Sequence, residues 1–164
     1  MNPSAETLID RLGLEPLPGE GGYFRETYRA LDRVGEKSCS TAIYYLITPD
    51  QFSTLHRLPT DEVWHFYMGD PVVQLRLTEG DGQWQELVLG QDICAQPTQL
   101  LQTTVPAGVW QGTCLAPGGK FALLGATMAP GFDFEDLELG DREKLTRQFP
   151  HQGSLIRAYT RSKP

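Results

Sequence analysis

Hydrophobic residues recur at every second position through most of the chain, in segments of five to nine residues. This period is typical of β-strands, because successive strand side chains point to opposite faces. The segments that fit it, or that are apolar on both faces, span residues 23–28, 40–48, 72–78, 84–89, 99–105, 109–115 and 121–128. Helical spacing occurs only at the two ends, in residues 5–12 and 141–149.

About ten short strands between two terminal helices predict an all-β domain, either a sandwich or a barrel. Turn-forming residues separate the segments, and one pair, Asp81-Gly82, suits the positive backbone angles of a tight hairpin. Periodicity alone leaves open whether the architecture is a double-sheet jelly roll or a lipocalin-type barrel. Either architecture would hold a ligand in its mouth.

The stretch 52–69, FSTLHRLPTDEVWHFYMG, carries the strongest candidates for chemistry. His56, Glu62 and His65 lie within ten residues, in two predicted strands joined by a short break. Antiparallel pairing across the break would place a histidine and a carboxylate together at a barrel mouth. Alternation places Glu62 on one face of its strand and His65 on the other, so we do not expect His65 to join the site.

We predict that His56 and Glu62 form a proton-handling pair, because a carboxylate orients an imidazole and raises its basicity. Tyr45, in the predicted strand 40–48, is the candidate acid. The alternative is a buried hydrogen bond between His56 and Glu62 that only joins two strands, and the sequence leaves this open.

Candidate ligand-binding residues are aromatic rings that can stack on a flat ligand and polar groups that can orient it. They are Tyr23, Arg25, Trp64, Phe66, Gln74 and Phe132. Trp64 and Phe66 share the predicted face of Glu62, and Arg25 shares a face with Tyr23. The alternative for each ring is a place in the core, and for Arg25 a place on the surface. The segment 129–140, which carries Phe132, is expected to wall the pocket or to clasp a second subunit.

Composition narrows the class of partner. The 164 residues suffice for one domain with a substantial core. A net charge of −7 with scattered basic residues argues against nucleic acid. The three cysteines show no zinc spacing and favour no disulfide framework, and neither a signal peptide nor a long apolar run is present. We therefore expect a cytoplasmic protein that binds a small molecule and has no membrane partner.

Two motifs within these segments resemble those of the cupin superfamily. His56-x-Leu58-x3-Glu62-x6-Gly69 is similar to the first cupin motif, in which two histidines and a glutamate coordinate a metal inside a jelly roll. The stretch 106–111, PAGVWQ, is similar to the second motif, with Gln111 at the position of its histidine. The match also favours Gln111 over its neighbour Trp110 as the residue that points at a ligand.

Longer stretches resemble one functionally uncharacterised branch, cupin family five. They are EGGYFRETYR (20–29), TAIYYLIT (41–48), HRLPTDEVWHFYMGDP (56–71), VPAGVWQG (105–112) and APGFDFEDLELG (129–140). The resemblance implies a jelly roll, or double-stranded β-helix, with short helices at both ends, commonly as a homodimer. It is compatible with a single domain over residues 1–164: an N-terminal helix in 1–13, a barrel in 20–128, and a C-terminal loop, helix and tail in 129–164. It supplies no reaction, because fold relatives include sugar-nucleotide epimerases, germins and auxin-binding proteins.

Departures from the general cupin pattern bear on metal binding. Leu58 and Gln111 stand where that pattern has ligating histidines. His56 and Glu62 would remain, with the amide of Gln111 as a weak third ligand, whereas catalytic zinc and non-haem iron sites normally offer three strong protein ligands. We therefore expect no tightly held metal and no other cofactor. A divalent ion, if bound, would be held by His56, Glu62 and Gln111.

Three functions follow from this reading. The first is a metal-independent epimerase- or isomerase-like enzyme that moves a proton next to a carbonyl of a carbohydrate or nucleotide-sugar, with His56 as base and Glu62 as its orienter. The second is a non-catalytic metabolite-binding module in which Arg25, Gln74 and Gln111 orient the ligand. The third is a metal-dependent oxygenase, which the missing histidines disfavour.

Overall fold

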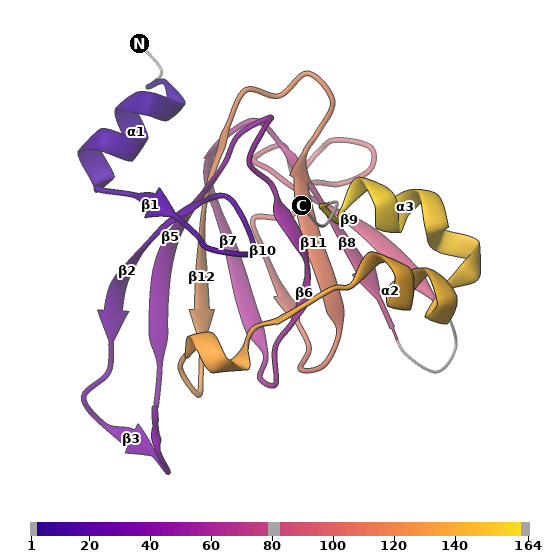
Figure 1. Cartoon of the computed structure of the whole chain (residues 1–164). Coiled ribbons are helices and arrows are strands. Elements are labelled where there is room, and N and C mark those ends of the chain that lie inside the picture. The colour runs from indigo at the N-terminus through magenta and orange to yellow at the C-terminus, as the bar shows by residue number, and fades with distance from the viewer. Residues whose placement is uncertain (1–2, 79–82, 162–164) are drawn as a thin grey trace.

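The computed structural model describes residues 3–78 and 83–161, whose strands form two facing sheets (Figure 1). The six-stranded sheet has the order β1-β2-β5-β12-β7-β10, and the five-stranded sheet has the order β13-β6-β11-β8-β9. Neighbouring strands in both sheets pair antiparallel. This is the jelly-roll arrangement, one of the two architectures that periodicity left open.

The strands are short, as the sequence predicted. In chain order they are β1 (Glu15–Pro16), β2 (Tyr23–Arg29), β3 (Arg33–Val34), β4 (Lys37–Ser38), β5 (Thr41–Ile47), β6 (Ser53–Arg57), β7 (Glu62–Gly69), β8 (Val72–Leu77), β9 (Trp84–Leu89), β10 (Gln102–Val105), β11 (Trp110–Leu115), β12 (Ala122–Met128) and β13 (Glu138–Leu139). The two-residue strands were not predicted, because they are too short to show a period. The predicted turn Asp81-Gly82 lies outside the described residues, and the strands β8 and β9 on either side of it pair antiparallel.

Helices cover the outer faces of the sheets. They are α1 (Ala5–Leu12), α2 (Arg142–Gln148) and α3 (Gly153–Ala158), with single turns η1 (Phe134–Asp136) and η2 (Pro150–Gln152). The predicted start and stop of the first helix are confirmed: Ser4 caps its N-terminus, and Gly13 ends it in the left-handed conformation at φ 60°. The sequence predicted one C-terminal helix, whereas the structure has two, because the second is only six residues long.

The helices pack where the strands leave apolar residues facing outward. Leu8 of α1 is buried with Leu46 and Leu123 on the outer face of the six-stranded sheet. The helices α2 and α3 pack on the outer face of the five-stranded sheet (Figure 1), where Leu145 and Ile156 are buried. None of the helices within residues 3–78 and 83–161 has the length and apolar character needed to cross a membrane.

Strand alternation in β7 sets the inside of the jelly roll. Glu62, Trp64 and Phe66 are buried, whereas Val63 and His65 between them are partly exposed. Trp64 and Phe66 belong to the core between the sheets. Glu62 lies at the end of that core, opposite Val105 of β10 and Met128 of β12. The alternation predicted for β7 is therefore confirmed. The predicted antiparallel pairing of the strands that carry His56 and Glu62 is wrong, because β6 pairs with β11 and β13 in one sheet and β7 pairs with β10 and β12 in the other.

A small hairpin and a connecting loop mark the end of the sheets where Glu62 lies. The hairpin β3–β4 projects beyond β2 and β5, and the loop that carries η1 runs beside it in orange (Figure 1). We call residues 129–139, from the end of β12 to β13, the strap. The strap ends in β13, which pairs with β6, so the C-terminal part of the chain contributes a strand to the five-stranded sheet.

Candidate functional site

His56 lies in β6 and is 1% exposed. Its Nδ1 is 2.8 Å from the carbonyl oxygen of Thr54. A carbonyl oxygen can only accept a hydrogen bond, so in the neutral imidazole Nδ1 carries the proton and Nε2 keeps its lone pair. This tautomer is the one that a general base acting through Nε2 requires.

A carboxylate that the sequence analysis missed lies beside this imidazole. Glu20 is 7% exposed, accepts a hydrogen bond of 2.7 Å from Ser53 Oγ, and places Oε1 3.9 Å from Nδ1 of His56. Its charge would stabilise the imidazolium that forms when Nε2 takes a proton. The role of orienting His56, which the sequence analysis gave to Glu62, therefore belongs to the Thr54 carbonyl and Glu20.

Glycines carry Glu20 to this position. Gly21 and Gly22 have φ angles of 98° and 72°, and a Cβ at position 22 would lie 2.5 Å from the hydroxyl oxygen of Tyr45. Only a chain without side chains there can turn so tightly against the tyrosine. The signal in the sequence is a glycine pair next to a carboxylate, which many loops contain, so it did not identify Glu20 as a site residue.

Glu62 is the second buried carboxyl of the site. Its Oε2 accepts hydrogen bonds of 2.7 Å from Gln111 Nε2 and 3.0 Å from Trp64 Nε1. Burial raises the pKa of Glu62 from 4.5 to about 7; His56 opposes the rise, Glu20 adds to it, and the two hydrogen bonds oppose it. At neutral pH the carboxyl therefore exists in both protonation states, as a group that takes and returns a proton must.

Gln111 links the parts of the site. It is 1% exposed and lies opposite His56 in the pairing of β6 with β11. Its Nε2 donates to Glu62, and its Oε1 accepts a hydrogen bond of 3.0 Å from Trp64 Nε1. Trp110, one position earlier, packs outward in the cluster beneath α2 and α3. Gln111 thus faces the interior, and both ends of its amide hold other site residues in place.

A cavity of about 110 Å³ lies beside Glu20 and Glu62. Its remaining wall is largely apolar and includes Leu17, Phe24, Ile43, Leu58, Met128 and Phe132. Glu26, Arg29 and Asp133 also line it, so Glu20 and Glu62 are the two buried carboxyls among four in the lining. The apolar part of the wall solvates the charge of these two poorly. A cavity of this volume has room for only a few small groups. It therefore admits the reacting end of a metabolite rather than a whole nucleotide-sugar.

Tyr23 and Arg25 lie on the other side of β2 from this cavity. Tyr23 packs with Leu8 of α1, and the guanidinium carbon of Arg25 is 5.8 Å from the centre of the Tyr44 ring. Phe24, between them in the strand, lines the cavity instead. The prediction that Tyr23 and Arg25 bind the ligand is therefore corrected. Alternation groups residues by face correctly, but it does not tell which face α1 covers.

Tyr45, Trp64 and Phe66 are core residues and do not line the cavity. The hydroxyl of Tyr45 donates a hydrogen bond of 2.7 Å to the Gly21 carbonyl oxygen, and burial raises its pKa well above the ordinary value. Both features make Tyr45 a poor acid, so the structure argues against that role. For Trp64 and Phe66 the core alternative applies, because Trp64 packs edge-on against Tyr45 at 5.5 Å between ring centres.

Gln74 of β8 is fully buried and is not among the residues that line the cavity. Its Oε1 accepts hydrogen bonds of 3.0 and 2.7 Å from Arg76, which also donates to Thr103 Oγ1 at 2.8 Å. Gln74 Nε2 is buried and has no hydrogen-bond partner among the described residues. The contact between Gln74 and a ligand stays a prediction.

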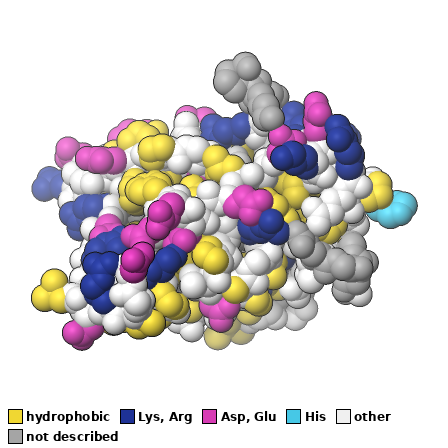
Figure 2. All heavy atoms as spheres, turned by 60° about the horizontal axis from the view of Figure 1, so that its bottom comes forward, with side chains coloured by type: hydrophobic (Ala, Val, Ile, Leu, Met, Phe, Trp, Pro, Cys, Tyr) yellow, Lys and Arg dark blue, Asp and Glu magenta, His cyan; other side chains and the backbone are white. Residues whose placement is uncertain are grey.

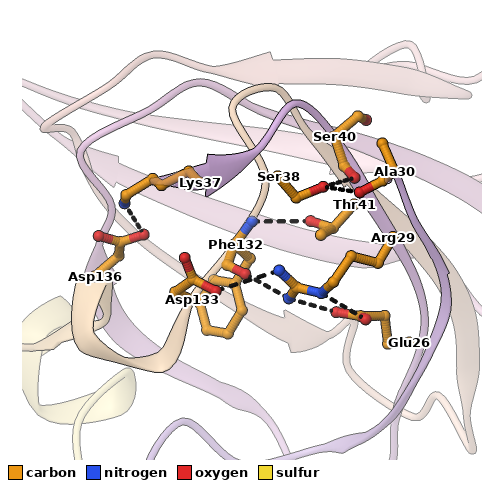
Figure 3. Close-up of polar contacts among 10 residues, drawn as sticks. All are labelled: Glu26, Arg29, Ala30, Lys37, Ser38, Ser40, Thr41, Phe132, Asp133 and Asp136. Atoms are coloured by element: carbon orange, nitrogen blue, oxygen red, sulfur yellow. Dashed lines mark hydrogen bonds and ion pairs between the residues drawn. The ribbon is translucent and has the colours of Figure 1, made fainter. Parts of the chain in front are cut away.

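Phe132 does line the cavity, as predicted, and the strap that carries it is fixed in place (Figure 3). Its backbone N–H donates to Thr41 Oγ1 at 2.9 Å, and its carbonyl accepts from Arg29 Nη2 at 2.7 Å. Lys37 of β4 also pairs with Asp136 of the strap. The strap therefore closes this end of the jelly roll through contacts with β2, β4 and β5.

His65 lies on the outer face of the six-stranded sheet, as predicted. Its Nε2 is 3.2 Å from Thr127 Oγ1, and its Nδ1 is 3.1 Å from Gln102 Nε2. The sheet therefore separates it from His56 and Glu62.

The donor set at the motif positions does not fit the divalent metal that general cupin motifs hold. Leu58 offers no donor atom, and Glu62 Oε2 and Gln111 Oε1 already accept hydrogen bonds within the protein. Within residues 3–78 and 83–161, no three His, Cys, Asp or Glu residues are grouped so that they could hold a metal ion. The expectation of a site without a tightly held metal rests on this donor set and stays a prediction.

Comparison with known proteins identifies the family of the chain. The model of the family described as Cupin superfamily (DUF985) matches residues 6–140. The chain belongs to this cupin family. An uncharacterised protein of Saccharomyces cerevisiae is 30% identical over 135 residues, which make up 71% of this cupin and 66% of the yeast protein. The match thus spans slightly less than two-thirds of that relative.

Solved structures extend the comparison to the fold. A hypothetical protein from Leishmania major superposes with a TM-score of 0.89 at 30% identity, over 98% of this cupin and 100% of that chain. A protein from Shewanella oneidensis superposes with a TM-score of 0.91 at 30% identity, over 99% and 100%. A Bacillus subtilis oxalate decarboxylase variant reaches 0.56 at 14% identity, over 89% of this chain and 37% of its own. That last likeness concerns the fold alone.

Proposed function

We propose that this cupin is a metal-independent, isomerase- or epimerase-like enzyme that moves a proton at a carbon next to a carbonyl group. The observation that carries the proposal is Glu62: a buried carboxyl, 7% exposed, that lines the cavity and has a pKa of about 7. A group that is half protonated at neutral pH serves equally well as base and as acid.

The chemistry follows from the two proton-handling groups. The Glu62 carboxylate takes the proton from the carbon, and the electron pair of the broken C–H bond moves toward the carbonyl oxygen. Return of a proton from Glu62 restores the original configuration. For inversion, the proton comes instead from the protonated imidazole of His56, which does not itself line the cavity but lies 3.9 Å from Glu20, which does. Glu20 stabilises this imidazolium. Glu62 then releases the proton that it took and His56 takes one up, so that both groups return to their starting states and no net proton is gained or lost. Gln111 and Trp64 hold the Glu62 oxygen in position.

The substrate we propose is a small carbonyl compound of carbohydrate type, or the sugar end of a nucleotide-sugar. The cavity of about 110 Å³ accepts only a few non-hydrogen atoms around the reacting carbon. The apolar residues of its wall leave few groups to solvate the intermediate, which strengthens the electrostatic effect of each charged group near it.

Solvent-deuterium exchange tests the proposal. Small ketoses, aldoses and oxo acids are incubated with the protein in D₂O, and NMR follows loss of the proton next to the carbonyl. We expect exchange with the wild type, and at least about 100-fold slower exchange with Glu62→Gln and with His56→Ala, the usual minimum for loss of a general acid–base group. His65→Ala, a histidine on the outer face, is the matched control and should exchange normally.

Two results would contradict the enzyme. Exchange at the wild-type rate in Glu62→Gln would remove the carboxyl from its role. A compound that raises the melting temperature without exchanging any proton would instead favour the non-catalytic metabolite-binding module, since binding to the folded state alone stabilises it.

A further inference from the structure

Two hollows at this end of the molecule share one wall. The inner one is the cavity of about 110 Å³ beside Glu62. The outer one, a groove of about 720 Å³, lies between the hairpin β3–β4 and the strap. Arg29, Asp133 and Phe134 line both of them. A ligand too long for the cavity would therefore extend into the groove if this wall opened.

The charged part of the wall is built around Arg29 (Figure 3). Glu26 holds the guanidinium with two hydrogen bonds, 2.9 Å from Nε and 2.8 Å from Nη2, and the Phe132 carbonyl accepts a third at 2.7 Å. Asp133 contributes a single bond of 3.2 Å from Nη1. Glu26 and Phe132 therefore fix Arg29 firmly, whereas the contact with Asp133 is the weakest of the set.

The carboxylate of Asp133 can be displaced from Arg29 by another anion. The Asp133 side chain is 36% exposed and that of Arg29 is 39% exposed. Ion pairs this exposed contribute little to stability, so an incoming anion can replace the carboxylate at small cost. The replacement would turn Asp133 away from Nη1, and the wall between cavity and groove would open there.

A second guanidinium faces the same groove. Arg33 of β3 lines it, and the Arg33 guanidinium makes no hydrogen bond or ion pair with any residue that the structure describes. Figure 2, which turns this end of the molecule forward, shows basic, acidic and hydrophobic side chains close together on its surface. Glu36 and Glu135 also line the groove, so its lining holds two guanidinium groups, those of Arg29 and Arg33, and three carboxyls including Asp133. Binding of an anion there therefore depends on both guanidinium groups and on the displacement of Asp133.

We propose that the groove is a second part of the binding site, which takes an oxyanion, a carboxylate or a phosphate, carried on the tail of the substrate. The tail displaces Asp133 from Arg29, and the carbonyl end of the same molecule lies in the inner cavity. The proposal rests on the proposed function in that it takes the cavity as the place of reaction. It makes Arg29 and Asp133 determinants of specificity for substrates with an anionic tail.

A homologous series of methyl-ketone acids tests this design, because it combines a small carbonyl end with a carboxylate at increasing distance. The probes are 2-oxopropanoate, 4-oxopentanoate, 5-oxohexanoate and 6-oxoheptanoate, each compared with an uncharged 2-alkanone of similar length. Dissociation constants are measured by NMR titration. We expect the longer acids to bind more tightly than their uncharged partners, and the shortest acid to bind poorly, because its carboxylate would meet Glu20 and Glu62.

Substitutions at the wall should act in opposite directions. Arg29→Gln should weaken binding of the longer acids by about tenfold or more, the usual value of a charge-assisted hydrogen bond. It should weaken binding of the alkanones much less, because they lose only the support that Arg29 gives to the strap through the Phe132 carbonyl. Asp133→Asn should strengthen binding of the same acids a few-fold, because the competing carboxylate is gone. Lys37→Met is the matched control, since it loosens the strap at Asp136 and keeps Arg29. It should not change the affinity for the acids relative to the affinity for the alkanones.

A second set of probes tells whether the groove prefers a phosphate tail or a carboxylate tail. Glyceraldehyde 3-phosphate and dihydroxyacetone phosphate are compared with glyceraldehyde and dihydroxyacetone on the same variants. Three results would overturn the proposal: no binding by any anionic probe, equal losses for charged and uncharged probes in Arg29→Gln, or weaker acid binding in Asp133→Asn. Binding with this pattern but without proton exchange would support the groove and contradict the proposed reaction.

Discussion

Replacing Glu62 by glutamine isolates the effect of one buried carboxyl. Glutamine has almost the same shape, and its oxygen can still accept the hydrogen bonds that Gln111 and Trp64 donate to Glu62 Oε2. The substitution therefore removes the titratable charge and preserves most contacts. We expect it to change how the stability of the protein depends on pH.

The pKa values set the magnitude and the sign. Glu62 has its ordinary pKa of 4.5 in the unfolded chain and about 7 in the folded protein, which corresponds to ~3 kcal/mol of folding free energy. Below 4.5 both states hold the proton. Between 4.5 and 7 mainly the unfolded state loses it, so this carboxyl lowers the stability as the pH rises. Above about 7 the folded protein carries a buried charge, and the full loss is reached.

Urea unfolding of both proteins at a series of pH values measures the effect. From about pH 4.5 to about pH 8, Glu62→Gln should gain up to ~3 kcal/mol over the wild type, or up to ~10 °C in melting temperature. Glu143→Gln is the control, because its side chain is 83% exposed, and it should follow the wild type. The reasoning would be refuted if the difference in unfolding free energy between variant and wild type stayed constant with pH. It would also be refuted if the wild type became more stable relative to the variant as the pH rises.

Further predictions concern the tyrosine and the metal. Tyr45→Phe should lower the free energy of unfolding by ~1–2 kcal/mol, because the Gly21 carbonyl loses its hydrogen-bond donor. A titration should show unchanged ligand binding, because Tyr45 does not line the cavity. Loss of ligand binding would contradict the placement of Tyr45 outside the cavity. Elemental analysis of protein purified without chelator should find no stoichiometric divalent metal, and a full equivalent of iron, manganese, nickel or zinc would contradict the account. The double variant Leu58→His, Gln111→His adds two strong ligands to the existing histidine and glutamate, so calorimetry should show about one divalent ion bound per chain. If the double variant binds no metal, the assigned geometry is contradicted.

The inward face of β7 could be predicted because burial forces a strict period of two. Glu62 and His65 fall on opposite faces for this reason alone, and the structure has them there. The same rule grouped Tyr23 with Arg25 correctly but placed them toward the ligand. The choice between faces depends on where α1 packs, and that contact joins residues far apart in the chain.

Glu20 shows what local patterns cannot supply. It lies in a loop, where no period exists. Its place beside His56 depends on Gly21, which fits against the Phe52 carbonyl oxygen, and on Gly22, which fits against Tyr45. The strap is similar: its acidic and aromatic residues suggested a wall or a clasp, but its partner Arg29 is about a hundred positions away. Such contacts follow from the tertiary fold, so the sequence alone identified Phe132 and not the ion pair beside it.

The most direct test of the account is the ionisation of Glu62 itself. In protein labelled with ¹³C at the glutamate side-chain carboxyl, the resonance missing from Glu62→Gln identifies Glu62, and its shift is followed against pH. The account predicts a midpoint near 7, set by burial. A midpoint at the ordinary 4.5 would show a solvated, permanently charged carboxylate, and would contradict a metal-independent acid–base site in this cavity.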